Sequence, residues 1–311
     1  MKVDQAVAAY VGFKQSLGIR FSTEARTLKS FSKSVGRVDL DRVGPMQVRV
    51  FLEGNGPLTR FWHRKFDALR GFYRFCVARG YCRRDPLPTV APKCPQSFTP
   101  YIYSEDEIGR LLEAAAGRAN CNIDASTSRT LLLLLYASGL RISEAMNLDM
   151  VDVDLEEGLL HIRETKFYKT RLVPTGKDLS RVLRGYALLR CQWPPIGPNT
   201  PFLLTRRGKR VSRAGAEEAF KQIREQAGVR RVDGARYQPR LHDLRHTFAQ
   251  TRLVRWYREG ADVQRLLPQL ATYLGHVHIT GTQRYLSMTP DLLKLASLRF
   301  EQFALGGADR A

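Results

Sequence analysis

Three separated segments of the chain combine residue types that suit chemistry on a phosphodiester. They are ASGLRISEAMNL at 137–148, HDLRH at 242–246 and YLGHVHITGTQRY at 273–285. Arg141 and Arg245 can bind phosphate oxygens through bidentate contacts, and they stay protonated while negative charge builds up in a transition state. Lysine would be a poor replacement for either residue because it lacks the planar fork of donors.

Tyr285, at the end of the third segment, is the candidate nucleophile. A phenol with a pKa of about 10 is only about one part in a thousand ionised at pH 7, so nearby cations or a proton acceptor must assist it. His242 precedes Arg245 by three residues, and on one helical turn the two would share a face and address the same ligand. His276 precedes Tyr285 by nine residues.

These side chains need rigid elements to position them. The apolar run Leu131–Tyr136 indicates a buried helix, and Gly139 can take the left-handed conformation that ends it. Such a turn would point Arg141 outward from a firm base. In the stretch Leu159–Pro174 two apolar runs flank a polar turn, which predicts a β-hairpin. Helical patterns dominate the rest, so we expect a mainly α fold with a small β-sheet.

The N-terminal residues 1–88 predict a separate helical domain. Its clearest helix runs from about Leu58 to Arg79 and carries one apolar stripe. The stripe consists of Phe66, Leu69, Phe72, Tyr73, Cys76 and Val77. The segment DPLPTVAPKCPQSFTP carries five prolines in sixteen residues, which favours extended backbone. We therefore expect a linker at 89–103 and a larger domain at 104–311.

The charge balance favours a polyanionic partner. Lys and Arg number 50 against 30 Asp and Glu, which gives a net charge of +20 and a pI near 10.1. Residues 1–95 hold 18 basic and 7 acidic side chains, so +11 of that charge lies in less than a third of the chain. Nucleic acid is the first candidate partner.

Other classes of protein are disfavoured by what the sequence lacks. No apolar run approaches the roughly 18 residues of a membrane-spanning helix, and the start MKVDQ has no signal-peptide character. The five cysteines form no C-x-x-C pair, so we expect reduced thiols in a cytoplasmic protein. His276 and His278 form an H-x-H pair without accompanying cysteines or an acidic cluster, and we expect no metal or other cofactor.

The motifs, in the order arginine, lysine, His-x-x-Arg, histidine and tyrosine, resemble the tyrosine recombinase (phage integrase) family. The tail GHVHITGTQRYLSMTPDLL is similar to that of transposon-encoded members, and ALRGFYRFCVARGYCRRDP resembles the family's core-binding domain. The resemblance implies a helical SAM-like core-binding domain followed by an α+β catalytic domain. It implies a site-specific DNA recombinase that acts in integration, excision or transposition of a mobile element. Strands would be cut and rejoined through a covalent 3′-phosphotyrosyl intermediate without ATP.

The same resemblance assigns roles to individual residues. Tyr285 would attack the DNA, His242 would act as its general base and acid, and His276 would hydrogen-bond the scissile phosphate. The leaving 5′ oxygen needs a proton, which the family takes from a lysine on the hairpin. Aligning RLVP at 171–174 places Lys166 in this role, with Lys169 as the alternative.

Further residues have supporting roles by the same resemblance or by their charge. Glu144, three residues after Arg141, matches an acidic position of the family and would orient that arginine. Ten basic side chains are candidate DNA contacts. For the five in the N-terminal domain a solvated basic face is an equally good interpretation, and for the five after residue 200 we expect phosphate contacts without sequence readout. The ten are Lys29, Lys33, Arg60, Arg64, Lys65, Arg206, Arg207, Lys209, Arg210 and Arg213. Ser212 is the expected N-cap of a helix that follows them.

The family also implies an assembly on double-stranded DNA. Two domains would close on the duplex as a C-shaped clamp, and four protomers would exchange strands through a Holliday junction, with accessory or sister recombinases as possible partners. A C-terminal helix would present an apolar stripe to a neighbouring protomer, although it could equally pack on its own domain. The stripe consists of Leu293, Ala296, Phe300, Phe303 and Ala304.

Two rival functions share many of these features. A type IB topoisomerase-like enzyme would use the same tyrosine chemistry to relax supercoils as a monomer. A catalytically silent DNA-binding accessory factor would keep the basic surface alone. One departure from compact family members is the segment between Arg245 and His276, which is several residues longer and leaves the geometry of its helix pair open.

Overall fold

A computed structural model of the chain describes residues 1–94, 99–119, 121–163, 170–235, 237–276 and 278–287, and also 294–295, 297–298 and 300–301. Its internal contacts divide the chain into two units, Met1–Phe98 and Thr99–Ala311. The division falls inside the proline-rich stretch 89–103. Within the described residues, no helix is long and apolar enough to cross a membrane.

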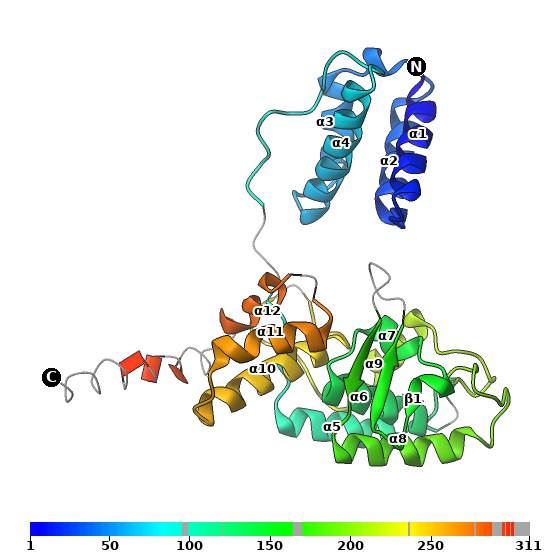
Figure 1. Cartoon of the computed structure of the whole chain (residues 1–311), viewed down its shortest axis with the longest axis vertical. Coiled ribbons are helices and arrows are strands. Elements are labelled where there is room, and N and C mark those ends of the chain that lie inside the picture. The colour runs from blue at the N-terminus through cyan, green and yellow to red at the C-terminus, as the bar shows by residue number, and fades with distance from the viewer. Residues whose placement is uncertain are drawn as a thin grey trace. The chain divides into compact units, whose positions relative to one another are not determined.

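The N-terminal unit is a group of helices around an aromatic core (Figure 1). The elements are α1 (Val3–Ser16), α2 (Ser22–Val35), the 3-10 turn η1 (Leu40–Arg42), α3 (Pro45–Glu53) and α4 (Arg60–Ala78). Helix α4 begins after Thr59, whose hydroxyl accepts a hydrogen bond from the Phe61 amide at 3.2 Å. Phe72 and Tyr73 of α4 are fully buried.

The predicted helix from Leu58 to Arg79 is confirmed, with one error in its apolar stripe. Leu69, Phe72, Tyr73 and Cys76 are fully buried, whereas Val77 is 42% exposed. Val77 follows Cys76 directly and therefore lies about 100° around the helix from it, off the buried face. An apolar side chain at the edge of a stripe can face solvent at little cost.

The C-terminal unit surrounds a small sheet with helices. The elements up to the sheet are α5 (Glu105–Ala116), α6 (Ala125–Ser138), α7 (Ile142–Met146), the 3-10 turn η2 (Met150–Asp152), β1 (Val153–Asp154), β2 (Leu159–Ile162) and β3 (Arg171–Pro174). After the sheet come α8 (Lys177–Arg190), α9 (Arg213–Gln226), α10 (Asp243–Arg258), α11 (Val263–Leu274), α12 (Thr280–Gln283) and the 3-10 turn η3 (Arg284–Ser287). The mainly α fold class with a small β-sheet is confirmed.

The three strands form an antiparallel sheet in the order β1-β2-β3. Leu160 of β2 faces Val153 of β1 and Val173 of β3, and the side chains of Leu160 and Val173 are fully buried. The predicted hairpin is therefore confirmed. Strand β1 was not predicted, because two residues are too few to show an alternating pattern. The two lysines that the sequence suggests for the hairpin, Lys166 and Lys169, lie outside the described residues.

Helix α6 lies at the centre of the C-terminal unit and contacts α5, α8 and α10. It begins after Asp124, which caps the Thr127 amide at 2.7 Å, and it ends at Gly139 with φ of 60°. A side chain at Gly139 would also collide with the ring of Phe248. The glycine predicted to end this helix is thus required both by its backbone conformation and by the close approach of α10.

A second, smaller hydrophobic cluster joins α10, α11 and Tyr285. In Figure 1 these helices, coloured yellow to orange, gather at one side of the C-terminal unit, beside the green body that holds α6 and the sheet. The long segment between Arg245 and His276 forms the rest of α10 and the whole of α11. Leu253 and Leu274 bury its apolar face.

Candidate active site

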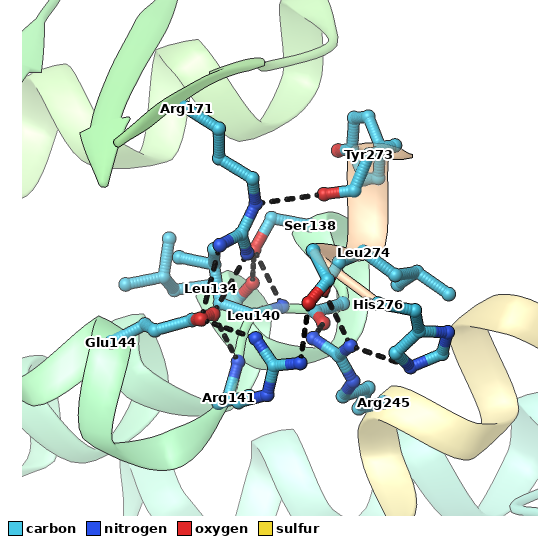
Figure 2. Close-up of polar contacts among 12 residues, drawn as sticks. Leu134, Ser138, Leu140, Arg141, Glu144, Arg171, Arg245, Tyr273, Leu274 and His276 are labelled. Carbon is cyan, nitrogen blue, oxygen red and sulfur yellow. Dashed lines mark hydrogen bonds and ion pairs between the residues drawn. The ribbon is translucent and has the colours of Figure 1, made fainter. Parts of the chain in front are cut away.

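The last turn of α11 is where the arginines of the site meet. Three consecutive backbone carbonyls, those of residues 273–275, each accept a hydrogen bond from a different arginine (Figure 2). The pairs are Arg171 Nε to Tyr273 O at 3.0 Å, Arg245 Nη2 to Leu274 O at 2.6 Å, and Arg141 Nη2 to Gly275 O at 2.7 Å. These arginines come from β3, α10 and the residue before α7, so one helix end gathers side chains from distant parts of the chain.

The local backbone explains why this helix end attracts cations. The last carbonyls of a helix have no intrahelical donors, and they form the negative end of its dipole. Helix α11 ends at Gly275 in the left-handed conformation, with φ of 67°, which turns the chain and leaves those carbonyls exposed to other donors. The guanidinium groups donate the missing hydrogen bonds to these carbonyls, and the carbonyls in turn fix the orientation of the guanidinium groups.

Glu144 binds two of the three arginines. Its carboxylate accepts from Arg141 Nη1 at 2.6 Å, and it forms a bidentate pair with Arg171 at 3.0 and 2.8 Å. Its side chain is only 6% exposed. Burial alone would raise the pKa of this carboxyl, but the hydrogen bonds and charges of Arg171 and Arg141 lower it to about 2. Glu144 is therefore ionised at neutral pH and holds the two guanidinium groups in a fixed geometry (Figure 2).

Arg245 is the most deeply buried of the three arginines, at 2% exposure. Besides Leu274 O, it donates to Gly139 O at 2.7 Å, and its Nη2 lies 3.1 Å from His276 Nε2. Burial and the neighbouring charge of Arg141 lower its pKa to about 10, which still leaves it charged at pH 7. Arg245 thus joins the turn after α6 to the turn after α11.

His276 follows Gly275 and is held by hydrogen bonds on both ring nitrogens. Its Nδ1 lies 2.7 Å from the hydroxyl of the fully buried Thr282, and its Nε2 contacts Arg245. Burial, with the positive charge of Arg245 and Arg141, lowers its pKa to about 4. The ring is neutral at pH 7, and both of its nitrogens have partners within the protein.

Tyr285 lies in the turn η3 and is only 3% exposed. Its ring is stacked near His276, with 6.2 Å between centroids, and lies 5.5 Å from the ring of His246. Burial raises the pKa of the phenol, while the charges of Arg245 and Arg141 act in the opposite direction. The candidate nucleophile is therefore a neutral phenol beside both arginines.

His242 and His246 bring two further imidazoles to the site. His242 is the N-cap of α10, and its ring centroid lies 5.2 Å from that of His246. Burial lowers the pKa of each to about 4. His246 contacts both the ring of His242 and that of Tyr285, and its Nδ1 is buried with no hydrogen-bond partner among the described residues.

Sequence reasoning missed two residues of this site. His246 stands inside the HDLRH motif, and its i, i+4 spacing from His242 on a helix was a visible signal. Arg171 opens the RLVP stretch that served only to align the hairpin. A lone arginine in a chain with 50 basic residues carries no distinguishing mark, so only the structure could reveal it.

The candidate DNA contacts include exposed side chains and side chains whose contacts within the protein can be named. Lys29, Lys33, Arg60 and Arg64 are exposed in the N-terminal unit, and Arg206, Arg207 and Lys209 are exposed in the other. In contrast, Lys65 donates to Phe51 O at 2.6 Å and lies over the Phe51 ring. Arg210 pairs with Asp149 at 2.5 Å, and Arg213 pairs with Glu217 at 2.8 Å.

Two sequence-based expectations lie beyond what the structure describes. Lys166, the candidate general acid, lies outside the described residues, as does Lys169. Of the five apolar residues in the C-terminal stripe, only Phe300 is described, and it is 71% exposed. The other four, Leu293, Ala296, Phe303 and Ala304, lie outside the described part.

The geometry defines a class of protein before any comparison is made. Two arginines, three partly buried neutral imidazoles and a buried phenol converge in a mainly helical unit. Residues 102–291 match the phage integrase family, and the chain belongs to that family, the tyrosine recombinases.

The relatives agree with this placement along nearly the whole chain. A putative integrase/recombinase y4rB of Sinorhizobium fredii is 35% identical over 304 residues, covering 96% of each chain. The tyrosine recombinase XerD of Mycobacterium leprae is 32% identical and covers 91% of this chain and 93% of its own. These relatives place the chain among the enzymes that carry out site-specific recombination.

Solved structures share the fold. The Tn1549 transposon integrase in complex with transposon right end DNA aligns with a TM-score of 0.72 over 98% of this chain and 100% of that one, at 16% identity. A lambda integrase tetramer bound to a Holliday junction aligns with a TM-score of 0.67 over 92% and 77%, at 15% identity. At such identities the likeness establishes the architecture alone.

Proposed function

We propose that this recombinase opens DNA strands with Tyr285 and that Arg141 and Arg245 bind the phosphate under attack. One observation carries the proposal. The ring of Tyr285 lies 6.2 Å, between centroids, from the ring of His276, and the Nε2 atom of His276 lies 3.1 Å from the guanidinium of Arg245, which also binds the end of α11. Nucleophile and charge-stabilising groups therefore already share one location.

The proposed cleavage step exchanges one phosphoester bond for another. The phenolic oxygen of Tyr285 attacks phosphorus, its bond to phosphorus forms, and the bond from phosphorus to the 5′ oxygen breaks. The phenolic proton passes to a histidine, and the departing 5′ oxygen receives a proton from Lys166, with Lys169 as the alternative. Rejoining runs the same steps in reverse with a 5′ hydroxyl as nucleophile, so no energy-rich cofactor is needed.

The histidine pair offers a route for the phenolic proton. By family resemblance His242 is the acceptor, and in the structure His246 stands between it and Tyr285. Both imidazoles are neutral at pH 7 because burial lowers their pKa to about 4. A phosphate nearby would raise both values and so strengthen them as bases.

The arginines supply the electrostatic part of catalysis. A pentacoordinate transition state carries more negative charge than the diester, and fixed guanidinium groups stabilise that added charge without reorganising. Arg141 has the most accessible side chain of the three, at 31%, compared with 12% for Arg171. Arg141 is therefore placed to meet an incoming phosphate first.

The burial of Tyr285 has a consequence for this mechanism. A phenol that is 3% exposed cannot meet a DNA phosphate until the turn around it moves. The carbonyls of residues 139, 274 and 275 now occupy donors of Arg141 and Arg245, and phosphate oxygens would take over some of those bonds. Cleavage would thus require phosphate oxygens of the DNA to replace backbone carbonyls as the acceptors of these arginine hydrogen bonds.

The finer features of the function follow the same proposal. Double-stranded DNA would contact the exposed basic side chains of both units, which would act as a clamp joined by the linker at 89–103. The reaction would serve a mobile element in a bacterial cytoplasm and would be carried out by four protomers on two DNA sites. In support, the structural neighbours include a transposon integrase on its DNA end and a tetramer on a Holliday junction.

A covalent-trapping experiment tests the central proposal. Nicked duplexes with a randomised core are incubated with the protein, strands that become protein-linked are recovered, and their sequence defines a substrate. Tyr285→Phe should abolish the adduct on this substrate while DNA binding persists, because the nucleophile alone is removed. Tyr136→Phe, which alters a half-buried phenol of α6, is the matched control. A persisting adduct in Tyr285→Phe would exclude this tyrosine, and no adduct with the unaltered protein would favour a silent DNA-binding factor.

A further inference from the structure

We propose that Arg171 is a positioning residue for strand cleavage, acting through Glu144 to keep the charge and orientation of Arg141 available to the phosphate. The inference rests on the proposed function of Arg141. Arg171 is the first residue of β3, and its guanidinium reaches the end of α11 and the side chain of Glu144 (Figure 2).

The contacts of Arg171 favour a positioning role over direct binding of phosphate. Each of its three nitrogens donates within the protein, Nε to Tyr273 O and the two Nη atoms to the two oxygens of Glu144. The side chain is 12% exposed, which is far less than the 31% of Arg141. Its hydrogen bonds therefore serve to fix other groups.

The charge balance gives Arg171 its effect on Arg141. Glu144 carries one negative charge that two guanidinium groups share. Without Arg171, that carboxylate would pair with Arg141 alone and would cancel most of the positive charge that faces the phosphate. With Arg171 present, the three groups together carry one net positive charge, and Arg141 is the member that solvent reaches.

The packing around Arg171 ties it to the same helix end that orders the other arginines. A Cβ atom added at Gly275 would lie 2.7 Å from Arg171 Nη1 and 2.9 Å from its Cζ. The guanidinium therefore lies directly against the backbone of Gly275, whose carbonyl binds Arg141. Arg171 and Arg141 thus contact Glu144 on one side and the turn after α11 on the other, which links their positions.

The test compares Arg171→Gln with Arg141→Ala and with the double variant, measuring single-turnover adduct formation. Arg171→Gln should slow the reaction by about 10- to 100-fold, which is less than the roughly 10²- to 10³-fold effect of removing a donor that itself contacts the transition state. In the Arg141→Ala background the same change should slow it by less than about 3-fold, because a residue that acts through Arg141 has nothing left to act on. Arg181→Gln on α8, which breaks an exposed ion pair with Asp178, is the matched control.

A second substrate separates an electrostatic role from a merely structural one. A methylphosphonate at the scissile position has no negative charge for Arg141 to offset, so the deficit of Arg171→Gln should shrink on it. Equal losses on both substrates, or additive losses with Arg141→Ala, would overturn the proposal. Arg171→Lys keeps the charge and serves if the Gln variant does not fold. Loss of function in Tyr285 variants is independent of all these outcomes, so failure of the proposed nucleophile would be seen separately.

Discussion

Two regions of the C-terminal unit bury an arginine against backbone carbonyls, and they do so for different ends. Arg190, at the end of α8, is 1% exposed and donates to the carbonyls of Trp193, Pro195 and Pro201 and to Thr200 Oγ1. All of these acceptors lie in the loop that follows it. Arg245 is equally buried, but its acceptors come from two turns far apart in sequence, and it also contacts His276.

The difference shows which kind of burial marks a site. Removing a guanidinium from water costs free energy in both places, and hydrogen bonds offset that cost in both. The hydrogen bonds of Arg190 stabilise only the loop that follows α8, so their structural effect is local. Around Arg245 the same bonds gather groups that could act on a phosphate, so the origin of the partners is more informative than burial alone.

The largest expected effect follows from changing Arg245 to lysine. Lysine keeps the charge but cannot reach Gly139 O, Leu274 O and a phosphate in the same planar arrangement. We expect adduct formation to slow by about 10²- to 10³-fold in single-turnover assays. The comparison with Arg190 breaks down if Arg190→Lys slows the chemical step to the same extent.

A comparably large effect is expected when Lys166, the candidate general acid, is changed to alanine. Lys166→Ala should slow adduct formation by about 10²-fold or more on ordinary DNA, because an alkoxide would have to leave unprotonated. A bridging sulfur in place of the 5′ oxygen leaves as a thiolate and should restore most of the rate. Lys169→Ala is the control, and a reversal of the two results would move the role to Lys169.

A smaller effect, on stability rather than on chemistry, is expected at Arg190. Arg190→Met leaves several buried carbonyls without donors, which should cost about 2–4 kcal/mol. The melting temperature should fall by roughly 5–10 °C for a unit of this size. At a temperature where the variant is folded, its rate of adduct formation should equal that of the unaltered protein. A slowed chemical step in the folded variant would show that the loop after α8 also serves the site.

The last of these effects is a dependence of stability on pH. His242, His246 and His276 have pKa values lowered to about 4 in the folded protein, below the ordinary value of 6.5. The unfolded chain therefore binds more protons between these values, and stability should fall as pH drops from about 6.5 toward 4. Thermal melts across this range measure the slope, and His276→Gln should reduce it. Arg190→Met should leave the slope unchanged, since no histidine lies in its loop.

Much of this fold could be predicted because local chemistry determines it. Gly139 ends α6, Ser212 caps α9 with a 3.1 Å hydrogen bond to the Gly215 amide, and the hairpin of β2 and β3 follows its apolar alternation. Each of these features depends on a few neighbouring residues. Strand β1 escaped prediction because its pairing is set by β2 and by no pattern of its own.

The site was predictable as a set of residues but not as an arrangement. Arg141, His242, Arg245, His276 and Tyr285 were identified from motif order, and the structure brings all of them together around the ends of α10 and α11. The contacts of Lys65 with Phe51 and of Arg210 with Asp149 were not predictable, because a basic side chain looks the same in a sequence whether it faces DNA or its own backbone. A contact between residues that are far apart in the chain produces no pattern in the sequence around either residue.

The final turn of α11 is a place where one local change in backbone structure would affect several residues of the site together. Four residues, 273–276, hold three guanidinium groups and one imidazole, so fraying of that turn would release all of them at once. Opening a single turn costs far less than unfolding a domain. Protection of the Gly275 and His276 amides against hydrogen exchange would report how readily this turn opens, because both amides donate to carbonyls of α11.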